Sequence, residues 1–140
     1  TWAGDFPKMD YEIRLEAMRA GGSDFFCGLT FPVNDSFASL ILGGWGGTVC
    51  GISCLDGEDA ANNETTTSTN FNNNTWYSVR LRVTKNKLEA WLDNEQIVNA
   101  DTKDRTIDVR IEVEESRPLG LATFQTTAAL RNISWRKLAE

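Results

Sequence analysis

The sequence predicts an all-β domain, an antiparallel β-sandwich or barrel, on three observations. Apolar and polar residues alternate with a period of two along most of the chain, which is the spacing of strands with one buried face. Turn-forming residues interrupt this alternation roughly every 8–12 residues. No segment shows a helical apolar pattern longer than two turns. The length of 140 residues fits a single domain over residues 1–140.

The first expected strand covers residues 11–19, where Tyr11, Ile13 and Leu15 alternate with charged residues. Later segments repeat this pattern or are more continuously apolar, as central strands are. These further strands are expected at residues 25–31, 37–43, 48–55, 76–84, 87–93, 96–99, 119–125 and 129–138. This number of short strands is typical of two packed sheets.

Three other segments complete the expected fold. Residues 56–75 are rich in Asp, Asn, Thr and Ser and predict a long loop with a short strand at 65–71. The region 101–117 is charged and ambiguous, and a strand at 108–115 stays open. The last two strands are expected to pair with each other around residues 126–128.

One hairpin can be paired residue by residue. A two-residue turn at 85–86 places Thr84 opposite Lys87. The pairs that follow outward from the turn are Arg82 with Glu89 and Arg80 with Trp91. One face of the hairpin is therefore apolar, and the other carries these two arginines, the glutamate and the tryptophan.

Composition excludes several functions. The formal net charge is −6, and no Lys or Arg occurs between Arg19 and Arg80, so no basic stripe for nucleic acid is expected. The chain contains no histidine, which removes Ser-His-Asp and Cys-His catalysis and histidine-based metal sites. No apolar run reaches the ~18 residues of a membrane span.

The stretch GGWGG at residues 43–47 places Trp45 between glycine pairs. A phosphate loop is excluded, because no lysine and no helix follow the glycines. The glycines predict a turn between two strands. Two interpretations of Trp45 stay open: it caps this turn, or it is presented outward as a platform for a sugar ring.

The loop after residue 55 is acidic. Its carboxylates and amides are Asp56, Glu58, Asp59, Glu64, Asn62 and Asn63. Calcium requires six to eight oxygen ligands, so a solvated loop is favoured. Calcium binding and direct binding of sugar hydroxyl groups stay alternatives. No metal residue is assigned and no cofactor is expected.

The three cysteines are Cys27, Cys50 and Cys54. Cys50 and Cys54 lie four residues apart on one expected strand, about 13 Å, which is too far for a disulfide. Buried thiols that act as small apolar side chains are favoured. A pairing of Cys27 with one of the other two stays open.

Three sets of residues carry a resemblance to a known family. They are Trp76, Tyr77, Arg80 and Val83; Trp91 and Asp93; and Leu130, Arg131, Asn132 and Ile133. With these markers the chain resembles the concanavalin A-like, or laminin G-like, jelly rolls. It most resembles the bacterial 3-keto-disaccharide hydrolase family, a former domain of unknown function. The GGWGG stretch and the acidic loop are similar to a subgroup common in planctomycete bacteria.

The resemblance implies an antiparallel β-sandwich jelly roll over about residues 5–138. Because such jelly rolls host lectins, glycosidases and silent structural domains, it implies no particular activity, and no catalytic residue is carried over. Family members have a longer segment before the first long strand. We therefore expect a module of a larger, secreted or periplasmic bacterial polypeptide, linked covalently to other domains.

The candidate site is the polar face of the predicted sheet. The candidate carbohydrate-binding residues are Glu12, Arg14, Arg80, Arg82, Glu89, Trp91 and Trp45. Arginines, carboxylates and an aromatic ring are the groups of a glycan groove, although an ordinary solvent-exposed face has the same composition. The function expected is carbohydrate binding without catalysis, with carbohydrate as the partner.

Two other functions remain as alternatives. The first is a glycoside hydrolase or lyase, for which Glu12, Glu16 and Glu89 are the available strand acids. Glu12 and Glu16 are four residues apart on one strand, about 13 Å, which is too far for a catalytic pair. The second alternative is a structural or protein-interaction domain.

Overall fold

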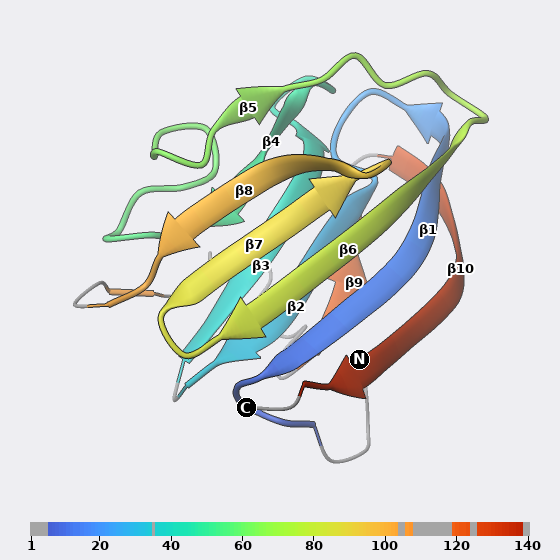
Figure 1. The fold of residues 1–140 in the computed structure, drawn as a ribbon. Helices are drawn as coiled ribbons and strands as arrows, with labels where there is room; N and C mark the ends of the chain where they lie inside the picture. Colours follow the sequence, from blue (N-terminus) through green and yellow to red (C-terminus); the bar gives the residue numbers. More distant parts are fainter. Residues whose placement is uncertain (1–5, 35, 104–105, 108–118, 124–125, 139–140) are drawn as a thin grey trace.

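The computed structural model describes residues 6–34, 36–103, 106–107, 119–123 and 126–138. These residues form two antiparallel five-stranded sheets that pack face to face (Figure 1). Sheet A contains, in spatial order, β10 (Thr126–Lys137), β1 (Tyr11–Gly22), β6 (Trp76–Thr84), β7 (Lys87–Leu92) and β8 (Glu95–Asp101). Sheet B contains β5 (Thr67–Ser68), β4 (Val49–Ser53), β3 (Ser36–Gly44), β2 (Cys27–Val33) and β9 (Gly120–Ala122). The predicted all-β sandwich is confirmed.

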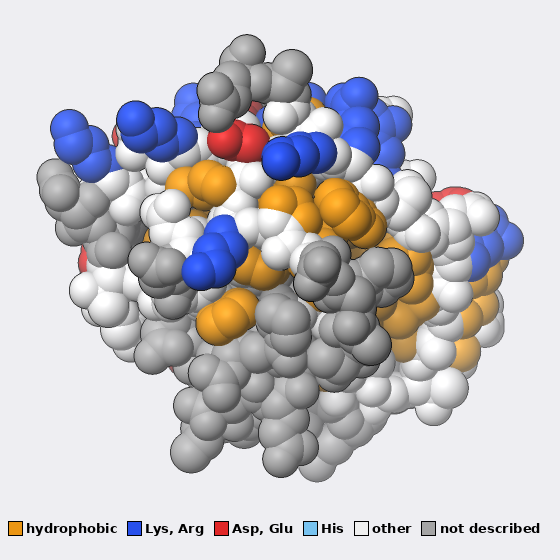
Figure 2. Space-filling view, turned by 90° about the horizontal axis from the view of Figure 1, so that it is seen from below, with side chains coloured by type: hydrophobic (Ala, Val, Ile, Leu, Met, Phe, Trp, Pro, Cys, Tyr) orange, Lys and Arg blue, Asp and Glu red, His pale blue; other side chains and the backbone are white. Residues whose placement is uncertain are grey.

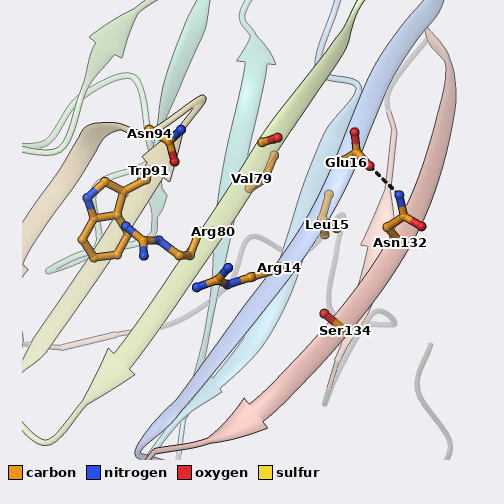
Figure 3. A pocket seen from close by; sticks show the side chains of 10 residues that line it. Arg14, Leu15, Glu16, Val79, Arg80, Trp91, Asn94, Asn132 and Ser134 are labelled. Atoms are coloured by element: carbon orange, nitrogen blue, oxygen red, sulfur yellow. Dashed lines mark hydrogen bonds between the residues drawn. The ribbon is translucent and has the colours of Figure 1, made fainter.

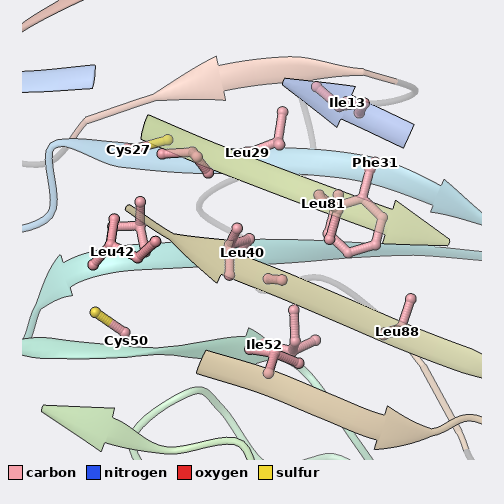
Figure 4. Packing of buried hydrophobic residues seen from close by; sticks show 14 of the residues in the cluster. Ile13, Cys27, Leu29, Phe31, Leu40, Leu42, Cys50, Ile52, Leu81 and Leu88 are labelled. Carbon is pink, nitrogen blue, oxygen red and sulfur yellow. The ribbon is translucent and has the colours of Figure 1, made fainter. Parts of the chain in front are cut away.

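The core lies between the two sheets, where strands contribute every second side chain (Figure 4). Sheet A contributes Ile13 and Leu81 among others, and sheet B contributes Leu40 and Phe31. Each large apolar side chain removed from water contributes about 1.5–3 kcal/mol. The alternation read from the sequence therefore has a direct energetic cause. The described residues contain no helix that could span a lipid bilayer.

The β6–β7 hairpin has the predicted register. Thr84 pairs with Lys87, Arg82 with Glu89, and Arg80 with Trp91. The two-residue turn fixes this register, because a slip by one residue would bring the charged side chains into the core. The apolar side chains of both strands are buried on the side of sheet B.

The predicted pairing of the last two strands is wrong. β9 pairs with β2 in sheet B, and β10 pairs with β1 in sheet A, so the chain crosses from one sheet to the other between them. Alternation locates a strand but does not identify its partner, because strand pairing depends on distant segments. The open strand at 108–115 lies outside the described residues.

The cysteines are free. Cys27 pairs with Leu42 on β3, and Cys50 lies on β4 beyond β3 (Figure 4). Two strand spacings amount to about 9.5 Å, beyond the ~7 Å between Cα atoms that a disulfide spans. Burial, reinforced by the neighbouring Cys50 thiol, raises the pKa of Cys27 to about 12. The packing role is confirmed for these two thiols, whereas Cys54 is half-buried.

The edge strand β10 leaves apolar side chains at the surface. Ile133 and Trp135 are 55% and 38% exposed, and the Trp135 ring also packs against Phe6 at 4.8 Å between ring centroids. Hydrophobic side chains likewise reach the surface in the view from below, with Lys and Arg side chains along one border (Figure 2). Sheet A thus ends in an amphipathic edge.

Candidate functional site

The outer face of sheet A, which points away from sheet B, carries six of the seven predicted site residues. Alternation along β1, β6 and β7 turns every second side chain outward. The charged and aromatic members of this outer face among the described residues are Glu12, Arg14, Glu16, Trp76, Arg80, Arg82, Lys87, Glu89, Trp91, Asp101, Arg131 and Arg136.

Part of the outer face is hollowed. The hollow has a volume of about 340 Å³ and is open to solvent. It is lined by Arg14, Leu15, Glu16, Ser78, Val79, Arg80, Trp91, Asn94, Asn132 and Ser134 (Figure 3). Two hydroxyl and two amide side chains thus lie beside two guanidinium groups and one indole ring.

Glu12 is the centre of a cluster of arginines beside the hollow. The side chain of Glu12 is fully covered, although it lies on the outer face. Arg82 Nη2 donates to its Oε1 at 3.1 Å, and the Nε atoms of Arg14 and Arg136 donate to its Oε2 at the same distance. Arg80 Nη1 lies 4.0 Å from Oε1. One carboxylate therefore organises four guanidinium groups from three strands.

The cluster keeps Glu12 ionised. Burial acts to raise the pKa of Glu12, but hydrogen bonds from Arg82 and Arg14 and the charges of Arg14 and Arg136 outweigh it, so the pKa is lowered overall. The arginines bonded to this carboxylate supply both N–H donors and positive charge, which explains why the charged form is favoured despite burial.

Glu16 is ionised as well. Hydrogen bonds from Asn132 and Arg131 lower its pKa, and the Arg131 Nη2 atom lies 3.3 Å from Glu16 Oε2. Figure 3 shows the Asn132 amide reaching from β10 to this carboxylate on β1. Neither Glu12 nor Glu16 is therefore a proton donor near neutral pH.

Trp91 forms one wall of the hollow together with Arg80. The guanidinium carbon of Arg80 lies 4.0 Å from the centroid of the Trp91 ring, and that of Arg82 lies 5.7 Å from it. These are cation–π contacts. The ring face turned toward Arg80 is therefore covered by the protein itself, and Trp91 as a whole is half-buried.

Trp45 lies elsewhere. It occupies the β3–β4 turn of sheet B, is 41% exposed, and does not line the hollow. The turn has the predicted glycine conformations, with φ of 79° at Gly43, 92° at Gly46 and 115° at Gly47. The structure thus separates Trp45 from the other candidate residues.

The acidic loop is held by its own hydrogen bonds. Asp59 Oδ1 accepts from the Ala61 N–H at 3.0 Å and from Asn62 Nδ2 at 2.9 Å. Asp56 Oδ1 accepts from the Thr106 N–H at 2.9 Å. In the described part of the chain, no three Cys, Asp or Glu side chains converge as metal ligands. The geometry fits the solvated-loop interpretation.

The sequence interpretation missed the residues that β10 supplies. In a regular strand Arg131 and Arg136, five positions apart, would point to opposite faces. A register shift between Arg14 and Glu16 brings both to the outer face, with Asn132 at a φ of 55°. The positive φ favours asparagine, but the sequence alone does not locate such a bulge.

Two face-to-face antiparallel sheets with a polar hollow on one outer face define a jelly-roll domain of the concanavalin A-like class. The family model of the 3-keto-alpha-glucoside-1,2-lyase-like domain matches residues 4–136, and the chain therefore belongs to this family. The predicted family resemblance is confirmed, and it connects the domain to carbohydrate. No match is found among curated proteins.

Proposed function

We propose that this domain is a carbohydrate-binding module without catalytic activity, and that the sugar occupies the hollow of sheet A. The observation that carries the proposal is the lining of the hollow. Ser78, Asn94 and Ser134 offer donors and acceptors for sugar hydroxyl groups, and Trp91 offers an aromatic surface. The volume of about 340 Å³ lies at the lower end of the ~300–1,000 Å³ usual for small-ligand sites.

The state of the carboxylates supports binding rather than hydrolysis. Glycoside hydrolysis by paired carboxylates requires one protonated acid beside one ionised partner. Glu12 and Glu16 both have lowered pKa values, and each is engaged by arginine. Sugar binding requires only their hydrogen-bonding capacity and that of the neighbouring side chains.

A 3-keto-glycoside lyase is the second candidate, because the family is named for this activity. Elimination requires a base next to the sugar, and Glu89 is an outer-face carboxylate without an arginine partner, on the same strand as Trp91 but outside the lining of the hollow. It accepts a hydrogen bond from Gln96 Nε2 at 3.1 Å rather than from an arginine.

The proposed binding function includes a location and a context. We propose that the domain is secreted or periplasmic and is linked covalently to further domains.

Replacing Trp91 tests the location of the site. We expect Trp91→Ala to weaken glycan binding about tenfold or more, because stacked aromatic surface and the position of Arg80 are lost together. Isothermal titration against a panel of soluble polysaccharides measures the effect. Trp45→Ala is the matched truncation on sheet B, with an expected change below about twofold.

Two results would contradict this account. Loss of binding in Trp45→Ala but not in Trp91→Ala would move the site to the β3–β4 turn. Release of product from a 3-keto-glucoside, followed by NMR and abolished in Glu89→Gln, would establish the lyase instead of the binding module.

A further inference from the structure

Positive charge is concentrated on the outer face of sheet A. The chain as a whole carries a net charge of −6, yet five of the six arginines that the structure describes lie on this face, together with Lys87. The five arginines are Arg14 from β1, Arg80 and Arg82 from β6, and Arg131 and Arg136 from β10. The planar fork of donors on arginine matches carboxylate and sulfate better than the lysine ammonium does.

The charges around Glu12 do not balance. Four guanidinium groups lie within 4.0 Å of this single carboxylate, so these five described side chains together carry an excess of three positive charges. One arginine suffices to pair one carboxylate in bidentate fashion. The excess therefore exceeds what holding Glu12 in place requires, and the cluster presents a positive surface to solvent.

Arg14 and Arg80 face each other directly. They are paired across β1 and β6 in the sheet register. Like charges at directly opposed positions destabilise a sheet. Glu12 relieves this repulsion only in part, because it contacts Arg14 at 3.1 Å but Arg80 at 4.0 Å. An anion bound between the two guanidinium groups would relieve the remainder.

The donors needed for such an anion are present. The side chain of Arg14 is 57% exposed and that of Arg80 is 31% exposed. A guanidinium group has five N–H donors. Arg14 donates its Nε–H to Glu12, and the guanidinium group of Arg80 stacks on the Trp91 ring. Both line the hollow, on the side where β1 and β6 adjoin (Figure 3).

We propose that the ligand of the hollow is an anionic glycan whose carboxylate or sulfate group binds between Arg14 and Arg80. This inference rests on the proposed carbohydrate function. The sugar ring attached to the anion would lie against Trp91, within reach of Asn94 and Ser134. A uronate and a sulfate ester share the required chemistry, which is a planar or tetrahedral oxyanion on a sugar.

The test compares three polysaccharides and one polyanion by isothermal titration with the full chain. Polygalacturonate supplies carboxylate, dextran sulfate supplies sulfate, and dextran is neutral; poly-glutamate carries charge without sugar. We expect binding to one or both acidic polysaccharides, no measurable binding to dextran, and little binding to poly-glutamate. Binding should weaken as sodium chloride rises, because surface ion pairs are screened.

Variants assign the effect to the hollow. Arg14→Gln should weaken acidic-glycan binding about tenfold, and Arg14→Lys should restore only part of it, since the bidentate fork is lost. Lys85→Gln removes the same charge from the exposed β6–β7 turn and should change the affinity less than about twofold. Circular dichroism confirms that each variant is folded.

The four titrations together decide whether the ligand is an acidic sugar, a neutral sugar or a polyanion without sugar. Binding of polygalacturonate alone, or of dextran sulfate alone, identifies which oxyanion is recognised and supports the inference. Equal affinity for dextran, unchanged in Arg14→Gln, would overturn the anionic ligand while leaving the carbohydrate function in place. Equal affinity for poly-glutamate would show charge attraction without sugar recognition. Binding of none of the four probes would overturn the anionic ligand, and failure of the polysaccharide panel as well would overturn the carbohydrate function.

Discussion

Replacing Glu12 with Gln is expected to lower the free energy of unfolding by about 2–4 kcal/mol. The substitution keeps the shape of the side chain but removes the charge that three arginines bind at 3.1 Å. Four guanidinium groups would then repel one another across β1, β6 and β10. Urea unfolding at pH 7, followed by tryptophan fluorescence, measures the loss.

Glu16→Gln is the matched control. This carboxylate lies on the same strand and pairs with Arg131, but it is partly exposed and its partner can turn to solvent. We expect a clearly smaller loss of stability than in Glu12→Gln, because exposed ion pairs contribute little. An equal loss in the two variants would show that the arginine cluster around Glu12 stabilises the fold no more than the Glu16–Arg131 ion pair does.

The same carboxylate predicts a dependence of stability on pH. The pKa of Glu12 is lower in the folded state than the ~4.3 usual for an unfolded glutamate, so the unfolded state takes up the proton first. The stabilisation is therefore complete above about pH 5 and is lost as the pH falls through the folded-state pKa. Glu12→Gln should show a weaker loss of stability over this acid range.

Replacing Arg19 with Met is expected to cost about 2–4 kcal/mol of stability. Arg19 is 8% exposed and donates to Asn73 Oδ1 at 2.6 Å, to the Phe71 carbonyl at 2.8 Å and to the Gly47 carbonyl at 3.3 Å. It thereby ties β1 to the glycine turn and to the segment before β6. Methionine fills similar space but leaves these acceptors without their donor.

Thermal unfolding of Arg19→Met and Arg19→Lys measures this contribution. Lysine keeps the charge but cannot reach three acceptors with a planar fork, so we expect partial recovery. Glycan affinity should stay unchanged at temperatures where the variant is folded, because Arg19 does not line the hollow. A change of unfolding free energy below about 0.5 kcal/mol in Arg19→Met would refute the role of this network.

The local parts of the fold could be predicted from the sequence, and the long-range parts could not. The β6–β7 register follows from a two-residue turn and the alternation beside it, and the structure agrees pair by pair. The partner of β10 depends on β1, more than a hundred residues away, where no turn constrains the pairing. For this reason the contribution of Arg131 and Arg136 to the site was missed.

The candidate site, too, could be predicted in its local features but not in its long-range contacts. Alternation placed Arg14, Arg80 and Trp91 on one face, and the structure brings them together around the hollow. The same alternation gave no sign that Glu12 is fully covered or that arginines of β1, β6 and β10 converge on it, because it does not show which strands are neighbours. Trp45 lies on the other sheet, which the sequence could not indicate, since turn chemistry fixes the shape of a loop but not its neighbours.

The most direct test of the central claim, that sugar binds in the hollow of sheet A, is an NMR titration that follows the tryptophan indole N–H signals. Spectra of Trp91→Phe and Trp45→Phe assign the two signals of interest. We expect an acidic polysaccharide fragment to shift the Trp91 signal in a saturable manner and to leave the Trp45 signal in place. Saturable shifts at Trp45, with none at Trp91, would contradict this claim.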